Sequence, residues 1–332
     1  MKPKVHIRVD GGQEFGLGHL VRCIALAQML KKAYDISFFS KEIPMKIARE
    51  IFENGFASEK ISSESEFFDV LEGNEIVVLD HYDLGTDHQR KIKEKGCRLV
   101  CIDDLHDKEF HADLIINHSP GITPQDYSAQ PYTQFALGPK YALLRSNFIQ
   151  AAGRERKIKS YDSVLICFGG SDPTNLTKKV LEYLGRSSLF LKITVVLGPS
   201  YAHKESLVAF ANKDHVTIME ALDEGAMLQA MLSTSIAVVP ASGIVMEAIA
   251  AGTVPLIGYA APNQKNIFRF FQESGDFGCF NGLDFLCSEL VEAVNKTLYQ
   301  TGSLNLDTYR KQIRDSELNH LQNFKNFNHG ES

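Results

Sequence analysis

The sequence has no long basic segment and no long uninterrupted apolar segment. Lys and Arg number 35 against 41 Asp and Glu, a net charge of −6, which disfavours nucleic acid as a partner. The most apolar stretch, residues 248–262, is broken by Gly252, Pro255 and Gly258 and is too short for a membrane span. Residues 1–10 alternate charged and apolar side chains, unlike a signal peptide. We therefore expect a cytoplasmic protein with neither nucleic acid nor membrane as partner.

Paired cysteine motifs and metal-ligand spacings are also missing. The six cysteines are scattered, and no CxxC pair lies near a second pair or a histidine, so we expect reduced thiols. There is no HxH, HExxH or DxD pattern, and we predict no metal and no cofactor. With 44% apolar and 23% charged residues, the composition excludes the disordered and fibrous classes.

What the sequence does contain is an alternation of apolar, strand-like runs with helical patterns, typical of βαβ units. At roughly 150 residues per domain, 332 residues make about two domains. Strands are expected at residues 4–9, 35–40, 75–80, 98–103 and 113–117, and again at 163–168, 192–197, 216–219, 236–240 and 254–257. A polar linker is expected at 150–160. We predict an α/β fold of two Rossmann-like domains facing across a cleft, residues 1–152 and 160–332, with a helix at 306–327 that can pack back on the first domain.

The first predicted strand leads into a glycine-rich turn and a helix that carries His19 and Arg22. The turn supplies Gly16 and Gly18 but no glycine at the third position of the GxGxxG dinucleotide fingerprint, so it matches the fingerprint only in part. A histidine in the first helical turn lies at the positive end of the helix dipole, which favours the neutral imidazole of a general base. His19 is therefore a candidate base, with simple capping of the helix as the alternative.

Two turns in the second half have the small residues that let a helix N-terminus bind an anion. The first contains Gly170 and Ser171, and the second contains Ser242 and Gly243, with Glu247 one helical turn later. Together they favour a nucleoside diphosphate, with Glu247 accepting from ribose hydroxyls, although neither has the lysine of a Walker loop. The alternatives are an ordinary helix start at the first turn and an exposed surface glutamate at the second.

Acidic, histidine and tyrosine residues also follow two predicted strands of the first domain, at 80–82 and 103–106. Because parallel strands end at one edge of a sheet, we expect them to face the same cleft as His19. They either orient a substrate or cap loops.

These segments, in their order and spacing, resemble the nucleotide-sugar hydrolases of pseudaminic acid biosynthesis, which cleave UDP-2,4-diacetamido-2,4,6-trideoxy-β-L-altropyranose. The resemblance covers most of the chain and rests on RVDGGQEFGLGHLVRCIALA (8–27), VLDHYDL (78–84), CIDDL (101–105), LGPKYALLR (137–145), FGGSDPTNLT (168–177), ASGIVMEA (241–248) and PNQKN (262–266). The family is similar to GT-B glycosyltransferases, among them the enzyme that adds GlcNAc to the peptidoglycan lipid precursor.

The resemblance implies that His19 is the base for water attack at the anomeric carbon of a UDP-sugar, which releases UDP with inversion. It also implies that Tyr82 and Asn263 contact the sugar and that Arg145 reaches the substrate. The remaining candidates for substrate binding are Asp10, Gly18 and Arg22, and for holding UDP they are Gly170, Ser171, Ser242, Gly243 and Glu247. The alternatives are a glycosyltransferase that passes the sugar to an acceptor and a non-catalytic nucleotide-sugar-binding protein. The oligomeric state, a monomer included, is left open.

Overall fold

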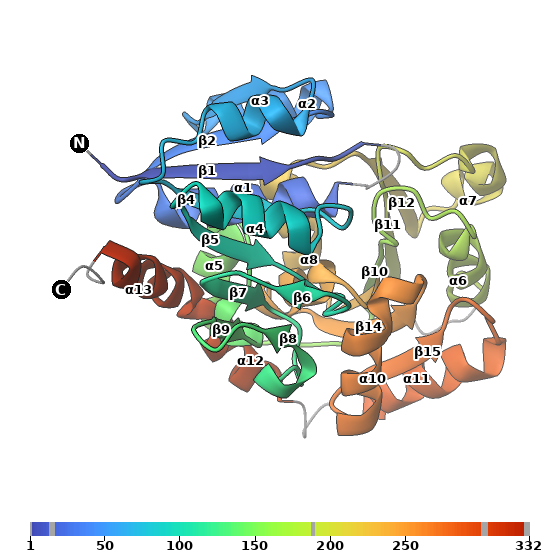
Figure 1. Cartoon of the computed structure of the whole chain (residues 1–332). Coiled ribbons are helices and arrows are strands. Elements are labelled where there is room, and N and C mark those ends of the chain that lie inside the picture. The colour runs from blue at the N-terminus through green and yellow to red at the C-terminus, as the bar shows by residue number, and fades with distance from the viewer. Residues whose placement is uncertain (1, 13–16, 187–189, 300–304, 329–332) are drawn as a thin grey trace. The chain divides into compact units, whose positions relative to one another are not determined.

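In the computed structural model, which describes residues 2–12, 17–186, 190–299 and 305–328, the chain forms two compact units. The first comprises Met1–Ser146 and Asp315–Ser332, and the second comprises Asn147–Arg314. Each unit is built around one parallel sheet packed against helices (Figure 1). None of the helices in the described part of the chain has the length and apolar character needed to cross a membrane.

The sheet of the first unit has seven strands in the order β3-β2-β1-β4-β5-β7-β9. Their bounds are β1 Lys4–Val9, β2 Asp35–Ser40, β3 Ala57–Lys60, β4 Ile76–Asp80, β5 Arg98–Ile102, β7 Leu114–Asn117 and β9 Gln134–Leu137. Inner strands such as β4 are buried along their whole length because the sheet is covered on both faces. A short pair, β6 Glu109–Phe110 and β8 Ser128–Ala129, stands apart.

The helices of this unit are α1 Gly18–Leu30, α2 Met45–Glu53, α3 Glu64–Asp69, α4 Thr86–Glu94 and α13 Ser316–Asn328, with short 3-10 turns η1 Pro124–Asp126 and η2 Pro139–Tyr141. Helix α1 is almost entirely buried between the sheet and α13, the last helix of the chain. The fully buried Phe324 of α13 belongs to the same apolar cluster as β1 and α1. The helix that carries His19 is therefore held on two sides.

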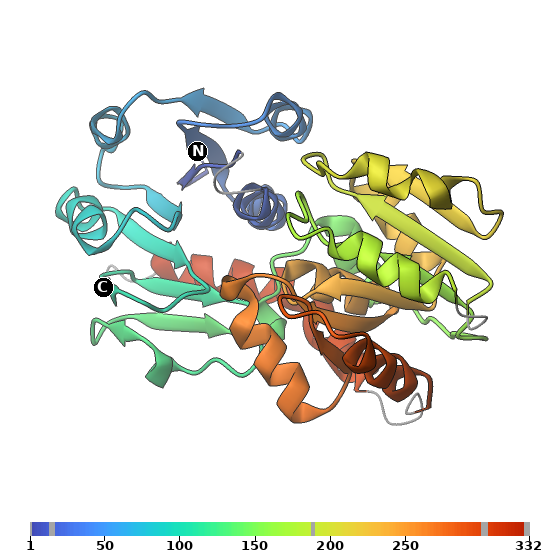
Figure 2. The same cartoon turned by 90° about the vertical axis from the view of Figure 1, so that its right-hand side faces the viewer.

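The second unit repeats this plan with six parallel strands in the order β12-β11-β10-β13-β14-β15. Their bounds are β10 Ser163–Ile166, β11 Lys192–Leu197, β12 Val216–Glu220, β13 Ile236–Pro240, β14 Val254–Tyr259 and β15 Gly278–Asn281. The helices are α5 Ser146–Ala152, whose first residue falls in the first unit, α6 Leu176–Leu184, α7 Val208–Ala211, α8 Glu224–Leu232, α9 Gly243–Ala250, α10 Lys265–Ser274, α11 Cys287–Tyr299 and α12 Leu306–Arg314, with η3 Lys204–Leu207 and η4 Pro262–Gln264. Helices α10 and α11 lie against β14 and β15 (Figure 2).

The predicted α/β class with parallel sheets is confirmed, and the predicted inner strands agree with the structure to within two residues at their ends. Three strands at sheet edges, β3, β9 and β15, were not predicted. The predicted helix at 306–327 is wrong as a single element, because it divides at Asp315 into α12 and α13. Helix α12 is anchored in the second unit, where the buried Arg310 donates to the carbonyl of Ala151, whereas α13 buries Phe324 in the first core.

Candidate active site

The first unit gathers charged side chains at the carboxyl ends of its central strands. His19 lies in the first turn of α1, and its ring is buried. Its Nδ1 atom lies 2.5 Å from Oδ1 of Asp80, the last residue of β4, which is 1% exposed. The strand that precedes α1, β1, is paired with β4. Two segments about sixty residues apart in sequence therefore meet at one edge of the sheet.

Arg22 holds the Asp80 carboxylate with two hydrogen bonds. Because Arg22 follows His19 by three residues on α1, the two side chains share one face of the helix. Arg22 Nε donates to Asp80 Oδ2 and Nη2 donates to Oδ1, both over 2.6 Å, while Nη1 donates to Oδ2 of Asp104 over 2.8 Å. Burial raises the pKa of Asp80, but the Arg22 guanidinium and the His19 ring outweigh burial and hold that pKa well below its usual range. Asp80 is therefore ionised.

The partners of His19 decide which ring nitrogen carries the proton. An ionised carboxylate can only accept, so Nδ1 must donate to Asp80. Arg22 Nη2 also lies 3.1 Å from this nitrogen, but a guanidinium only donates, so this longer contact is not a hydrogen bond in that tautomer. In the neutral ring, Nε2 then has the lone pair and is the atom that can take a proton from a ligand or a water molecule.

Tyr82, in the loop after β4, completes this group. Its ring meets the ring of His19 edge to face, with 4.5 Å between centroids and 82° between planes. Its hydroxyl donates to Oδ2 of Asp104 over 3.2 Å. Burial raises the pKa of Asp104, but Arg22 reverses the effect and keeps the carboxyl ionised. We call His19, Arg22, Asp80, Tyr82 and Asp104 the base cluster.

Asp10, a predicted substrate-binding residue, is engaged within the chain. Its Oδ2 accepts from Arg8 Nη2 over 2.7 Å and from His81 Nε2 over 3.1 Å. Its Oδ1 accepts from the backbone N–H groups of Lys41 and Glu42 over 2.6 and 3.2 Å. Asp10 therefore ties the end of β1 to the loops after β2 and β4, and its contact with substrate stays a prediction.

Two other predicted residues of this unit lie at element starts. Gly18 is the first residue of α1, and a Cβ placed there would meet no described atom within 4 Å. Arg145 is half-buried and directly precedes α5. The predicted Gly16 lies outside the described residues.

The first predicted phosphate turn of the second unit follows β10. Gly169 has a φ of +78°, and the carbonyl of Gly170 accepts from Ser200 N–H over 3.0 Å. A Cβ on Gly198 would lie 2.2 Å from the carbonyl oxygen of Gly169, so only glycine allows this close approach. Ser171 follows in the same turn, which is thus fixed through its carbonyl oxygens.

The second predicted turn follows β13, the strand paired with β10. Ser242 is the N-cap of α9 but its side chain makes no capping hydrogen bond, and Gly243 begins the helix. Glu247 is only 9% exposed, so the alternative of an exposed surface glutamate is wrong. Asn263 lies exposed in η4, just after β14. Strand β13 pairs with β10 on one side and with β14 on the other. Residues near 170, 242 and 263 therefore follow three adjacent strands.

The predicted residues thus fall into two groups, with His19, Arg22 and Tyr82 together in the first unit and the turns and Asn263 at one edge of the second sheet. Asp80 and Asp104 lie in the groups at 80–82 and 103–106 that were expected to face the same cleft as His19, but neither was assigned a catalytic or binding role, although each hydrogen-bonds directly to a residue that was. Their place at the ends of predicted strands was the available signal. Among the described residues, no three His, Cys, Asp or Glu side chains are arranged so that they could hold a metal ion.

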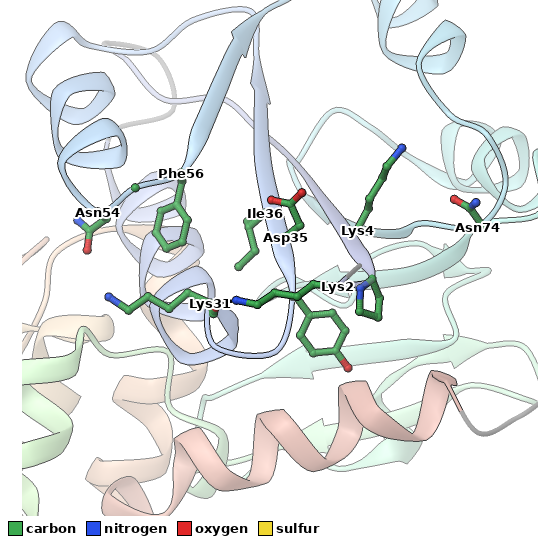
Figure 3. A pocket seen from close by; sticks show the side chains of 11 residues that line it. Lys2, Lys4, Lys31, Asp35, Ile36, Asn54, Phe56 and Asn74 are labelled. Carbon is green, nitrogen blue, oxygen red and sulfur yellow. Dashed lines mark hydrogen bonds between the residues drawn. The ribbon is translucent and has the colours of Figure 1, made fainter.

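A pocket of about 700 Å³ lies at the opposite edge of the first sheet, where β1 and β2 begin (Figure 3). Its described lining includes none of the predicted site residues. Two of its lysines are already engaged, because Lys2 Nζ donates to the carbonyl of Lys31 over 2.9 Å and Lys4 Nζ pairs with Glu72 over 3.1 Å. Ligands of parallel α/β sheets bind at the carboxyl ends of strands, so the base cluster is the better candidate.

Comparison with solved structures defines the class of fold. The chain matches Acinetobacter baumannii MurG with a TM-score of 0.61 and 12% identity, covering 98% of this chain and 100% of that one. It matches a UDP-glucosyltransferase from Polygonum tinctorium with a TM-score of 0.64 and 10% identity, covering 98% of each chain. The fold is therefore of the GT-B glycosyltransferase type, as predicted.

Comparison of sequences defines the family, although no family model matches the chain. The chain is 30% identical over 253 residues to the UDP-2,4-diacetamido-2,4,6-trideoxy-β-L-altropyranose hydrolase of Campylobacter jejuni, covering 74% of this chain and 88% of that protein. It belongs to this hydrolase family. It is also 25% identical over 301 residues to the spore coat polysaccharide biosynthesis protein SpsG of Bacillus subtilis, covering 86% and 85% of the two chains. A third relative is the protein MJ1062 of Methanocaldococcus jannaschii, 28% identical over 280 residues, or 80% of this chain; the match spans 57% of that protein's length.

Proposed function

We propose that the protein hydrolyses a UDP-sugar and that its substrate is the one named for the Campylobacter relative, UDP-2,4-diacetamido-2,4,6-trideoxy-β-L-altropyranose. The observation that carries the proposal is the pairing of His19 with the ionised, buried Asp80, which leaves Nε2 as the proton acceptor. Membership of the hydrolase family supports the reaction type and the sugar.

In the proposed reaction, His19 Nε2 removes a proton from a water molecule as the water oxygen attacks the anomeric carbon. The bond between that carbon and the diphosphate oxygen breaks, its electron pair leaves with UDP, and the configuration at carbon is inverted. Asp80 stabilises the positive charge that His19 gains, and Arg22 keeps Asp80 ionised and in place. A positioned general base contributes roughly 10²- to 10⁴-fold in rate.

We assign UDP to the second unit. The two turns at Gly170–Ser171 and Ser242–Gly243 precede helices α6 and α9, whose N-termini favour the negative charge of a departing diphosphate. Glu247 accepts from the ribose hydroxyls. Tyr82, Asn263 and Arg145 contact the sugar or its diphosphate, and no metal takes part in the step.

The test is proton NMR of the purified protein with this UDP-sugar, without an acceptor or added metal. The wild type is expected to release UDP and free sugar of inverted configuration, and His19→Ala to be slower by ~100-fold or more while binding UDP normally. His111→Ala is the matched control, because His111 lies next to the amino end of β7, away from the base cluster.

Three outcomes contradict parts of the proposal. Normal turnover by His19→Ala shows that His19 is not the general base. Release of UDP only when an acceptor is added identifies a glycosyltransferase instead. UDP binding with no turnover under either condition identifies a non-catalytic binding protein.

A further inference from the structure

The register of the first sheet adds a second histidine to the base cluster. Ile102 of β5 pairs with Ile116 of β7, so Asp104 and His118, each two residues beyond these partners, follow the carboxyl ends of neighbouring strands. Tyr82, from the loop after the next strand, donates its hydroxyl to Asp104 over 3.2 Å. Tyr82, Asp104 and His118 thus follow the carboxyl ends of three adjacent strands, β4, β5 and β7. The charges of Arg22, Asp104 and Asp80 all act on the pKa of the His118 ring, which agrees with a place near the cluster.

The contacts of His118 fix its chemistry. The backbone N–H of Leu143 donates to its Nδ1 over 3.4 Å, so the ring proton is on Nε2. Burial lowers the pKa of His118 to about 4, with Arg22 adding to the effect, and the ring is neutral near pH 7. Within the described part of the chain, Nε2 has no hydrogen-bond partner, so its N–H is a donor that remains for a ligand.

We propose that His118 contacts the substrate, donating from Nε2 to an uncharged acceptor oxygen on the sugar, the carbonyl of an amide substituent. This rests on the proposed function. The cluster disfavours the diphosphate as the partner of His118, because two carboxylates face one guanidinium there and the net charge of these three groups is negative. A neutral donor beside that charge suits a neutral acceptor, and the sugar named for the Campylobacter relative has two acetamido groups.

The role predicted for His118 is selection of the sugar, because a site built to hydrogen-bond a substrate group discriminates strongly against analogues that lack it. His118 is a substrate-contacting residue in this proposal, distinct from His19, which takes the proton. Loss of the contact should therefore weaken binding of the sugar moiety and leave both UDP binding and the proton transfer intact.

The experiment measures kcat and KM for UDP release, and Kd for UDP and for the intact UDP-sugar, in the wild type, His118→Ala, His118→Gln and His111→Ala. For His118→Ala we expect KM to rise about 10- to 100-fold with kcat changed less than about 3-fold and Kd for UDP unchanged. Gln places an amide N–H near the position of Nε2, so His118→Gln should recover at least part of the loss. It also serves if His118→Ala does not fold.

Unchanged KM in His118→Ala overturns the proposal, as does a loss that His118→Gln shares in full together with a fall in Tm, which indicates a purely structural role. If the wild type releases no UDP, the proposed function fails. The role of His118 is then tested by the Kd values for UDP and for the UDP-sugar. The ratio of Kd for UDP to Kd for the UDP-sugar should then fall about 10-fold or more in His118→Ala, and an unchanged ratio overturns the role of His118 separately.

Discussion

Asp80→Asn tests the arrangement on which the proposed base depends. Asn keeps the size of Asp80 and one acceptor oxygen, but it cannot provide the negative charge that pairs with both His19 and Arg22. His19 then loses the partner that fixes its Nδ1 proton and that stabilises its charged form. The same substitution in a Ser-His-Asp triad costs ~10⁴-fold in kcat, so we expect a loss of ~10³- to 10⁴-fold here. Because Asp80 is 1% exposed, we also expect about 1–3 kcal/mol of destabilisation.

The assay is UDP release followed by NMR, with UDP affinity from calorimetry and Tm measured on the same preparations. The matched control is Asp104→Asn, which changes a carboxylate that hydrogen-bonds to Arg22 and Tyr82, whereas the carboxylate at Nδ1 of His19 is Asp80. We expect the control to lose about 10-fold in kcat at most. The reasoning is refuted if Asp80→Asn stays within tenfold of the wild type, or if both variants lose activity equally.

Three further substitutions test the two units separately. Burial raises the pKa of Asp103 to about 6, so the stability that the protonated carboxyl contributes is present below its unfolded pKa of 3.8 and is lost as pH rises through 6. In urea unfolding, the free energy of unfolding of Asp103→Asn should therefore match that of the wild type near pH 4 and exceed it at pH 7.5 by up to about 3 kcal/mol. Equal stability of the two proteins at both pH values contradicts this prediction. Gly198→Ala would place a Cβ 2.2 Å from the carbonyl oxygen of Gly169 and 2.3 Å from that of Gly170, so this turn would have to shift. Calorimetry should then show UDP binding weakened about 10-fold or more. Unchanged affinity would show that this turn does not bind UDP. Phe324→Ala should lower the unfolding free energy of the first unit by about 3–5 kcal/mol because Phe324 is fully buried. The control is Leu318→Ala, at an exposed position of the same helix, which should change the unfolding free energy by no more than about 0.5 kcal/mol.

The sequence predicts inner strands such as β4 and β13 well because they are buried on both faces and contain mainly apolar residues. β4 and β13 are buried at every position. β3 has the sequence ASEK, with all four residues exposed, and takes its strand conformation from the ladder with β2. β3 therefore has no hydrophobic pattern of its own, whereas β9 and β15, which were also not predicted, include buried residues but are only four residues long.

Site residues can be predicted from the sequence where they lie in a recognisable local pattern. A strand, a glycine and a helix start identify His19 and the turns at Gly170 and Ser242. Predicting that Asp80 is the partner of His19 requires knowledge of the pairing of β1 with β4, strands that lie some seventy residues apart in sequence. Asp10 was predicted to bind substrate, and the structure shows that both of its carboxylate oxygens accept hydrogen bonds from within the chain, which the sequence alone did not indicate.

One pairing in the base cluster could have been inferred without any strand register. His19 and Arg22 are three residues apart, and a helix places such residues on one face. A base and a guanidinium on the same face repel each other once the base is charged, a carboxylate between them offsets this repulsion, and Asp80 occupies that place. Because α1 is buried, with β1 on one side and α13 packed against it on another, the last helix of the chain helps to hold the helix that carries His19 and Arg22.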